Sequence, residues 1–179
     1  MSNDVAYPVL RTRDPGIALD TARQLVMLGV RPHSEVSAEA EVTSTVRVRQ
    51  IREAFPEAWC SSRTAPSGPD VLPITVSMFD QPVGTVEEHF TALVGSDPAE
   101  IRWSALQWPG VPERRLRAEG KHAEVTLLLN CDSPAFDART DTHLVLVHVR
   151  RRNGDGYEHR LAQWLAQQAG QQVIGPPQS

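Results

Sequence analysis

The amino-acid sequence predicts an α+β fold, a mainly antiparallel sheet with helices packed on one face. Several segments alternate apolar and polar side chains, which is typical of strands with one buried face. Other segments repeat apolar residues at helical spacing. The predicted strands often follow one another with few helices between them, which favours antiparallel pairing. A chain of 179 residues is long enough to form one domain with a substantial core.

Composition excludes several classes of function. With 40% hydrophobic and 22% charged residues, the chain is typical of soluble globular proteins rather than disordered ones. The net charge of −4 gives no general attraction to nucleic acid or to an anionic membrane. No apolar run approaches the roughly 20 residues of a membrane helix, and residues 1–16 lack the pattern of a signal peptide. We therefore expect a cytoplasmic protein without a membrane partner, and nucleic acid is an unfavoured partner.

Two rare residue types add to this picture. Lys121 is the only lysine beside many arginines, a coding bias typical of GC-rich genomes such as those of actinobacteria and their phages. Cys60 and Cys131 are the only cysteines, so a disulfide framework is excluded and one optional bridge is left. We expect both thiols to be reduced, which agrees with a cytoplasmic protein.

The first half of the chain begins with a predicted helix over residues 14–30, with Asp14 as N-cap, Pro15 at the first helical position and Gly29 at the C-terminal end. Residues 35–49 then place valine and alanine on even positions, interrupted only at Ser44, which predicts a long half-exposed strand. Their alanines and glutamates also permit a helix that continues through residues 50–55, and this alternative stays open. Residues 56–70 are rich in proline, serine and glycine and are predicted to form a loop.

In the second half, Pro73 favours a strand start or an edge strand. Thr85 and the glutamates after it indicate a helix N-terminus. A turn at Gly120–Lys121 indicates a hairpin. Asp155 is the expected cap of the last helix. The predicted elements are a strand over 71–80, a helix over 85–95, a short strand or irregular segment over 101–110, a hairpin over 114–131, a strand over 141–151 and a helix over 155–169.

The default organisation is a single domain over residues 1–179. The loop at 56–70 could instead divide the chain into an N-terminal helix–strand unit, residues 1–53, and a main α+β unit, residues 54–170. Residues 171–179 are predicted to be a flexible tail.

Residues 143–161 look most like a site, because they hold three histidines and an arginine triplet. Alternate strand residues share a face, so His143 and His148 point to opposite faces and cannot bind one metal ion without a bulge. His159 falls on the solvent side of the last helix. No Cys-x-x-Cys or His-x-His pattern is present. We therefore predict no metal ion and no cofactor.

Catalytic residues are not predicted either. Cys131 is a candidate nucleophile, with His122 or His143 as its partner. The sequence, however, defines neither a base within reach nor an oxyanion donor. Glu87 and Glu88 fit a role in the first helical turn, where carboxylates complement the helix dipole. The sequence leaves enzyme activity uncertain and leans against it.

The predicted interaction surface combines two tryptophans with two groups of arginines. Trp103 and Trp108 fit either the core or a groove for a partner. The arginines fit a solvated edge or a local contact with an anion or nucleic acid. The candidate residues are Trp103, Trp108, Arg114, Arg115, Arg117, Arg150, Arg151 and Arg152.

Residues 54–170 resemble PsbP-like domains, including the LpqN-type proteins of mycobacteria. The resemblance rests on PEAW at 56–59, on ITVSMFDQPVGTVEEHF at 74–90, and on the order hairpin, strand and helix over 114–169. It implies a central antiparallel sheet flanked by helices, in a family mostly of accessory and binding proteins without catalytic residues. No site residue of that family matches a position in this chain, and residues 1–50 have no counterpart.

The leading hypothesis is a non-enzymatic accessory or assembly protein that binds a protein partner or itself, such as a phage structural protein or a secretion component. It rests on the long half-polar strand and on the missing catalytic constellation. One alternative is a small-molecule-binding or hydrolytic enzyme with a pocket over the sheet near Trp103, Trp108 and His122. Another is nucleic-acid contact through the arginines.

Overall fold

A computed structural model describes residues 4–62, 71–152 and 156–178. These residues form an antiparallel sheet of seven strands with four α-helices, so the predicted α+β fold is confirmed. The strands are β1 (Asp4–Thr12), β2 (Glu35–Val42), β3 (Trp59–Ser62), β4 (Ile74–Pro82), β5 (Ala99–Ser104), β6 (Glu124–Leu129) and β7 (His143–Arg150). The helices are α1 (Pro15–Gly29), α2 (Thr45–Ala54), α3 (Glu87–Val94) and α4 (Tyr157–Gln168), with a 3-10 helix at Pro112–Arg114.

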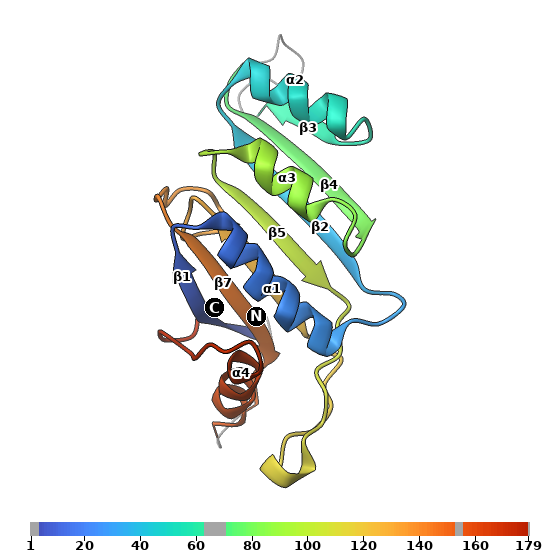
Figure 1. Cartoon of the computed structure of the whole chain (residues 1–179), viewed down its shortest axis with the longest axis vertical. Helices are drawn as coiled ribbons and strands as arrows, with labels where there is room; N and C mark the ends of the chain where they lie inside the picture. The colour runs from blue at the N-terminus through green and yellow to red at the C-terminus, as the bar shows by residue number, and fades with distance from the viewer. Residues whose placement is uncertain (1–3, 63–70, 153–155, 179) are drawn as a thin grey trace.

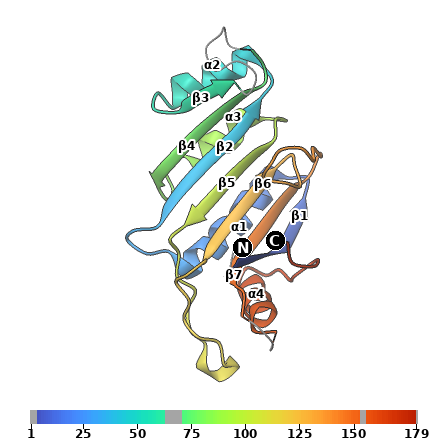
Figure 2. The same cartoon turned by 180° about the vertical axis from the view of Figure 1, so that it is seen from behind.

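The sheet has the strand order β1-β7-β6-β5-β2-β4-β3, and every neighbouring pair is antiparallel. The first 50 residues join this sheet, because β2 lies between β5 and β4 while β1 forms one edge. The helices lie on one face of the sheet (Figure 1), and the view from behind shows the strands of the other face in front of them (Figure 2). The main core lies between the helices and the sheet.

Helix α1 begins as predicted, because the Asp14 carboxylate accepts hydrogen bonds from the backbone N–H groups of Gly16 and Ile17 at 2.8 and 3.1 Å. The helix also ends at Gly29, but this glycine does not adopt the left-handed conformation of a helix C-cap. Its role is close packing, since a Cβ atom there would lie 3.1 Å from the ring of Trp108.

The segment predicted as one strand over residues 35–49 changes conformation at Ser44. Strand β2 ends at Val42, and α2 begins at Thr45. The cause is local, because the Ser44 hydroxyl accepts a hydrogen bond from the backbone N–H of Arg47 and so caps a new helix. The strand prediction is wrong beyond Val42, and the helical alternative is correct for α2.

Helix α3 begins at Glu87, and Thr85 does not cap it as predicted, because the Thr85 hydroxyl donates to the carbonyl of Pro82 instead. The buried Glu87 carboxylate accepts from the backbone N–H groups of Gly84 and Val86 at 2.7 and 3.1 Å. A first-turn glutamate therefore binds the backbone N–H groups of the residues that lead into the helix. Gly95 ends the helix with φ of 57°, a conformation that favours glycine.

The hairpin predicted over residues 114–131 is wrong, since only β6 is a strand in that range. Residues 105–123 form a narrow arm that extends beyond the sheet between β5 and β6 (Figure 1). Isolated bridges pair Trp108 with Glu119 across it, and the chain reverses near Arg115, which has φ of 57°. The Tyr157 hydroxyl of α4 binds the backbone of Arg117 and holds the arm beside α4.

At the C-terminal end, α4 begins at Tyr157, and the predicted cap Asp155 lies outside the described residues. Residues 171–178, which the sequence predicts to be flexible, lie along the edge strand β1. Ala6 and Gln178 exchange two backbone hydrogen bonds of 3.0 and 2.8 Å, and the Ile174 N–H donates to the carbonyl of Pro8 at 2.9 Å. These bonds occupy part of the β1 edge.

Candidate functional site: the open face of the sheet

The face of the sheet that carries no helix is called the open face here. Strand alternation determines its side chains, because apolar residues of β2 such as Val36 and Ala38 point to the helices while the glutamates between them point away. Across the sheet, Glu39 lies opposite Ser77 of β4 on one side and opposite Glu100 of β5 on the other.

One half of the open face, over β1, β7 and β6, is covered by the loop of residues 130–142. Phe136 of this loop is 6% exposed and packs in a second apolar cluster with Ala6, Leu128, Cys131, Leu144 and Leu146. Two ion pairs anchor the loop across the sheet, from Asp132 to Arg11 of β1 and from Arg139 to Glu41 of β2. The chain therefore covers the apolar residues of this half itself.

The other half, over β3 and β4, displays two aromatic side chains. Trp59 is 65% exposed and Phe79 is 53% exposed. Both lie on the open face, because Trp59 pairs with Ser77, and Phe79 follows Ser77 by two residues along β4. Together with Phe55, they line a hollow of about 410 Å³ at the β3–β4 end of the sheet.

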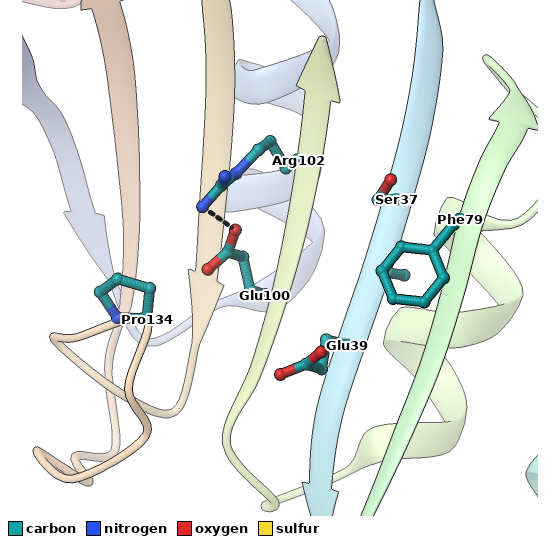
Figure 3. Close-up of a pocket in the computed structure, with 7 residues that line it drawn as sticks. Ser37, Glu39, Phe79, Glu100, Arg102 and Pro134 are labelled. Atoms are coloured by element: carbon teal, nitrogen blue, oxygen red, sulfur yellow. Dashed lines mark ion pairs between the residues drawn. The ribbon is translucent and has the colours of Figure 1, made fainter. Parts of the chain in front are cut away.

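A second hollow of about 380 Å³ lies next to the first, over β2 and β5. It is lined by Ser37, Ala38, Glu39, Phe79, Glu100, Arg102 and Pro134. Figure 3 shows the Phe79 ring on one side of this hollow, Pro134 on the other, and the carboxylates of Glu39 and Glu100 between them. Phe79 lines both hollows and therefore stands between them.

The second hollow has an excess of negative charge. Glu39 and Glu100 are direct cross-strand partners, an arrangement that is unfavourable for like charges. Arg102 forms an ion pair of 2.6 Å with Glu100 (Figure 3), whereas Glu39 accepts the Ser77 hydroxyl at 2.9 Å and has no ion pair within the described residues. Burial raises the pKa of Glu100, and the neighbouring Glu39 and Glu124 carboxylates raise it further against the effect of Arg102.

Trp103 and Trp108, predicted for either the core or a partner surface, are both completely buried. The Trp103 indole N–H donates to Glu87 at 3.0 Å, and the Trp108 indole N–H donates to the carbonyl of His148 at 2.8 Å. The core interpretation holds for both residues. The predictions of a partner surface or a pocket at these indoles are corrected, because large apolar rings with internal partners gain most from burial.

The predicted arginine surface is divided by the fold. Arg114, Arg115 and Arg117 lie exposed on the arm, while Arg150 is at the end of β7 and Arg151 is exposed just after it. Arg152 lies beside the arm, where its guanidinium binds Glu119 at 2.7 Å and sits 4.8 Å from the centre of the Tyr157 ring. Arg117 and Arg152 therefore meet through Tyr157, and a carboxylate already pairs with one of them.

His143 and His148 lie on opposite faces of β7, as strand alternation predicts. His143 accepts from the backbone N–H of Asn130, while His148 contacts Thr126 and Asp4 on the open face. No group of three His, Cys, Asp or Glu residues within the described part of the chain could hold a metal ion. Burial raises the pKa of the Cys131 thiol to about 11, so this cysteine is not an activated nucleophile.

The sequence interpretation missed the two exposed aromatics. A signal existed for Phe79, since it shares the odd positions of β4 with the polar residues Thr75 and Ser77. An aromatic residue on the polar side of an alternating strand indicates an exposed ring. Trp59 gave no such signal, because the proline-rich context of residues 56–70 predicts a loop.

No protein-family model, curated protein or solved structure matches this chain. The resemblance of residues 54–170 to PsbP-like domains therefore stays a prediction. Among the described residues, every helix is too short or too polar to cross a membrane.

Proposed function

We propose that the protein is a non-enzymatic accessory protein that holds a partner protein on the β3–β4 half of its open face. The main support is that two aromatic side chains, those of Trp59 and Phe79, are exposed on one face at one end of the sheet. Single exposed apolar residues are common on protein surfaces, but two aromatic rings beside one hollow are typical of the anchor residues of a binding surface.

The other half of the same face supports this proposal. There the chain uses Phe136 and the loop of residues 130–142 to cover its apolar residues. Trp59 and Phe79 receive no comparable cover within the described residues. Because burying an aromatic ring contributes about 1.5–3 kcal/mol, a partner that covers these rings gains a substantial part of its binding free energy.

A different protein fits this surface better than a second copy of the chain. In a two-fold pairing of open faces, both copies use the same patch. With the two-fold axis at the acidic hollow, Glu39 and Glu100 of one copy would approach those of the other, and like charges repel. The free thiols of Cys60 and Cys131 are in keeping with the reducing cytoplasm as the place of binding, and the PsbP-like resemblance points to the same class of accessory protein.

The test is photo-cross-linking in the cells that produce the protein. The photoreactive residue p-benzoylphenylalanine replaces Phe79 in one variant and Met27 in the control, since Met27 of α1 is also exposed, at 70%, but lies on the helix side. We expect a discrete cross-linked partner from position 79 that is missing from position 27, identified by mass spectrometry. No discrete product at position 79, or the same products at both positions, contradicts the proposal. A cross-linked product with twice the mass of the chain would show that this surface binds a second copy of the chain, and self-association would then replace the proposed partner protein.

A further inference from the structure

We infer that the partner presents an arginine flanked by apolar side chains, with the guanidinium in the hollow beside Glu39 and the apolar groups between Trp59 and Phe79. This inference rests on the proposed function and adds the chemistry of the partner.

The first step is the adjacency of two different hollows. The hollow beside Trp59 has Phe55, Pro56, Met78 and Phe79 among its lining residues, together with one carboxylate, that of Glu57. The hollow beside Glu39 holds two carboxylates and one guanidinium. Because Phe79 belongs to both, a ligand that fills them places an apolar group and a polar group on either side of one ring.

The second step is the sign of the charge. Glu39, Glu100 and Arg102 together leave one negative charge in the second hollow. Arg102 pairs with Glu100, so Glu39 is the carboxylate without a cation among the described residues. The cross-strand pairing of Glu39 with Glu100 also carries a cost for the fold. Arg102 offsets the charge of Glu100, and the Ser77 hydroxyl binds Glu39 without neutralising it. A cation from a partner would neutralise the negative charge that is left.

The third step selects the kind of cation. A bound metal ion needs several convergent ligands, and no such group occurs among the described residues. The hollow instead combines a carboxylate with an aromatic ring, and Figure 3 shows the Phe79 ring beside Ser37 of β2 and the Glu39 carboxylate further along β2, on the side of β5. A guanidinium stacks on aromatic rings and binds carboxylates with two parallel hydrogen bonds, whereas an ammonium is a more strongly hydrated point charge. Arginine is therefore favoured over lysine.

The charge of the open face also argues against nucleic acid on this surface. Glu35, Glu39, Glu41, Glu100 and Glu124 alternate with the core-facing residues of β2, β5 and β6 and so belong to the open face. A phosphate backbone would be repelled by these carboxylates.

The experiment uses the whole protein and a labelled synthetic peptide, Gly-Ser-Leu-Arg-Leu-Ser-Gly, as the probe. In matched peptides, citrulline or lysine replaces the arginine, and citrulline keeps the shape of the side chain without its charge. Binding is followed by NMR titration at low salt. We expect the arginine peptide to bind about tenfold more tightly than the citrulline peptide, and added salt to reduce this ratio.

Two protein variants locate the effect. Glu39→Gln keeps an acceptor for Ser77 but removes the charge, so we expect the arginine-to-citrulline ratio to fall close to one. The control Glu88→Gln removes one charge from α3, where the Glu88 side chain is 83% exposed, and we expect the ratio to be unchanged. The comparison between peptides on the unaltered protein is independent of the folding of any variant.

Equal affinity for the arginine and citrulline peptides, no measurable binding of the arginine peptide, or an unchanged ratio in Glu39→Gln overturns the inference. A lysine peptide that binds as tightly as the arginine peptide overturns the choice of guanidinium. The photo-cross-link at position 79 is read separately. A partner cross-linked there without arginine selectivity leaves the proposed function standing, and a missing cross-link contradicts the function itself.

Discussion

The two halves of the open face differ in whether the chain covers their apolar side chains. Over β1, β7 and β6, the sheet presents Leu128, Leu144 and Leu146, and the loop of residues 130–142 buries them beneath Phe136. Over β3 and β4, the sheet presents Trp59 and Phe79, and both rings are exposed. The two edge strands of the sheet differ in the same way. Residues 171–178 bind along the β1 edge, whereas β3 pairs only with β4 among the described residues.

This difference helps to interpret the exposed apolar residues of the sheet. An exposed ring on a polar surface carries little information alone. It carries more when the same sheet buries comparable residues a few strands away with a dedicated loop and two anchoring ion pairs. The contrast separates a surface that the chain covers from a surface that it leaves exposed, and the proposed function concerns the exposed one.

The largest expected effect compares one phenylalanine from each half. We expect Phe136→Ala to lower the free energy of unfolding by about 3 kcal/mol, because it removes the ring that buries the second apolar cluster. We expect Phe79→Ala to change it by less than about 0.5 kcal/mol, since its ring is half exposed. Urea denaturation of both variants measures the difference, and equal losses would remove the contrast between the halves.

The next effect concerns the covered edge. A chain shortened after Gly170 loses the backbone hydrogen bonds of Ala6 with Gln178 and of Ile174 with Pro8. We expect a loss of about 2 kcal/mol in unfolding free energy, from net contributions of about 0.5–1.5 kcal/mol per bond. Hydrogen exchange should also show faster exchange of the Ala6 amide. Unchanged exchange at Ala6 would mean that the C-terminal residues do not protect this edge.

The two cysteines differ in burial, because Cys131 is fully buried in the covered half of the open face, whereas Cys60 of β3 is half-buried on the helix side of the sheet. Burial raises the pKa of Cys131 from 9.0 to about 11, and its thiol is fully buried, so we expect it to react with a thiol reagent at least about tenfold more slowly than Cys60. Mass spectrometry of partly labelled native protein checks this, with denatured protein as the control for intrinsic reactivity.

The same thiol gives a pH dependence with a defined sign. Its folded pKa is higher than its unfolded pKa, so its contribution to stability is fully present below pH 9 and is lost as the pH rises through about 11. Cys131→Ser should remove this part of the alkaline loss of stability. An identical alkaline profile in the variant would assign that loss to other groups.

The smallest expected effect is electrostatic. The Glu39 carboxylate contributes to the raised pKa of Glu100, so Glu39→Gln should lower the pKa of Glu100 slightly toward its ordinary value. NMR titration of the Glu100 side chain measures this change, with Glu88→Gln as control. A Glu100 pKa that does not respond would show that the two carboxylates are screened from each other and would weaken the argument for an acidic hollow.

Sequence patterns predict the elements of this fold better than their boundaries. The even-position apolar residues of β2 and the Asp14 cap of α1 are local signals, and the structure agrees with both. Val46 and Val48 continue the same alternation, but the serine cap at Ser44 starts a helix there. The arm replaces a predicted hairpin because contacts distant in sequence, such as Tyr157 with the backbone of Arg117, determine its conformation. No local pattern contains those contacts.

The candidate site was harder to predict for a related reason. Tryptophan and arginine are enriched in interfaces, and this composition drew attention to Trp103 and Trp108, which the fold buries. The adjacency of Trp59, Phe79 and Glu39 depends on the strand order β2-β4-β3, which places three separate segments side by side. Strand alternation assigns a residue to a face, but only the order of the strands shows which residues meet on it.

The C-terminal residues along β1 also limit what the molecule can assemble into. A sheet with two open edges can add strands at both ends and grow without limit, as in fibrils. Here Gln178 and Ile174 already occupy backbone groups of Ala6 and Pro8. If a strand of another molecule adds to the β3 edge, the β1 edge does not offer a second equivalent site. The result would be a complex of fixed size instead of a polymer.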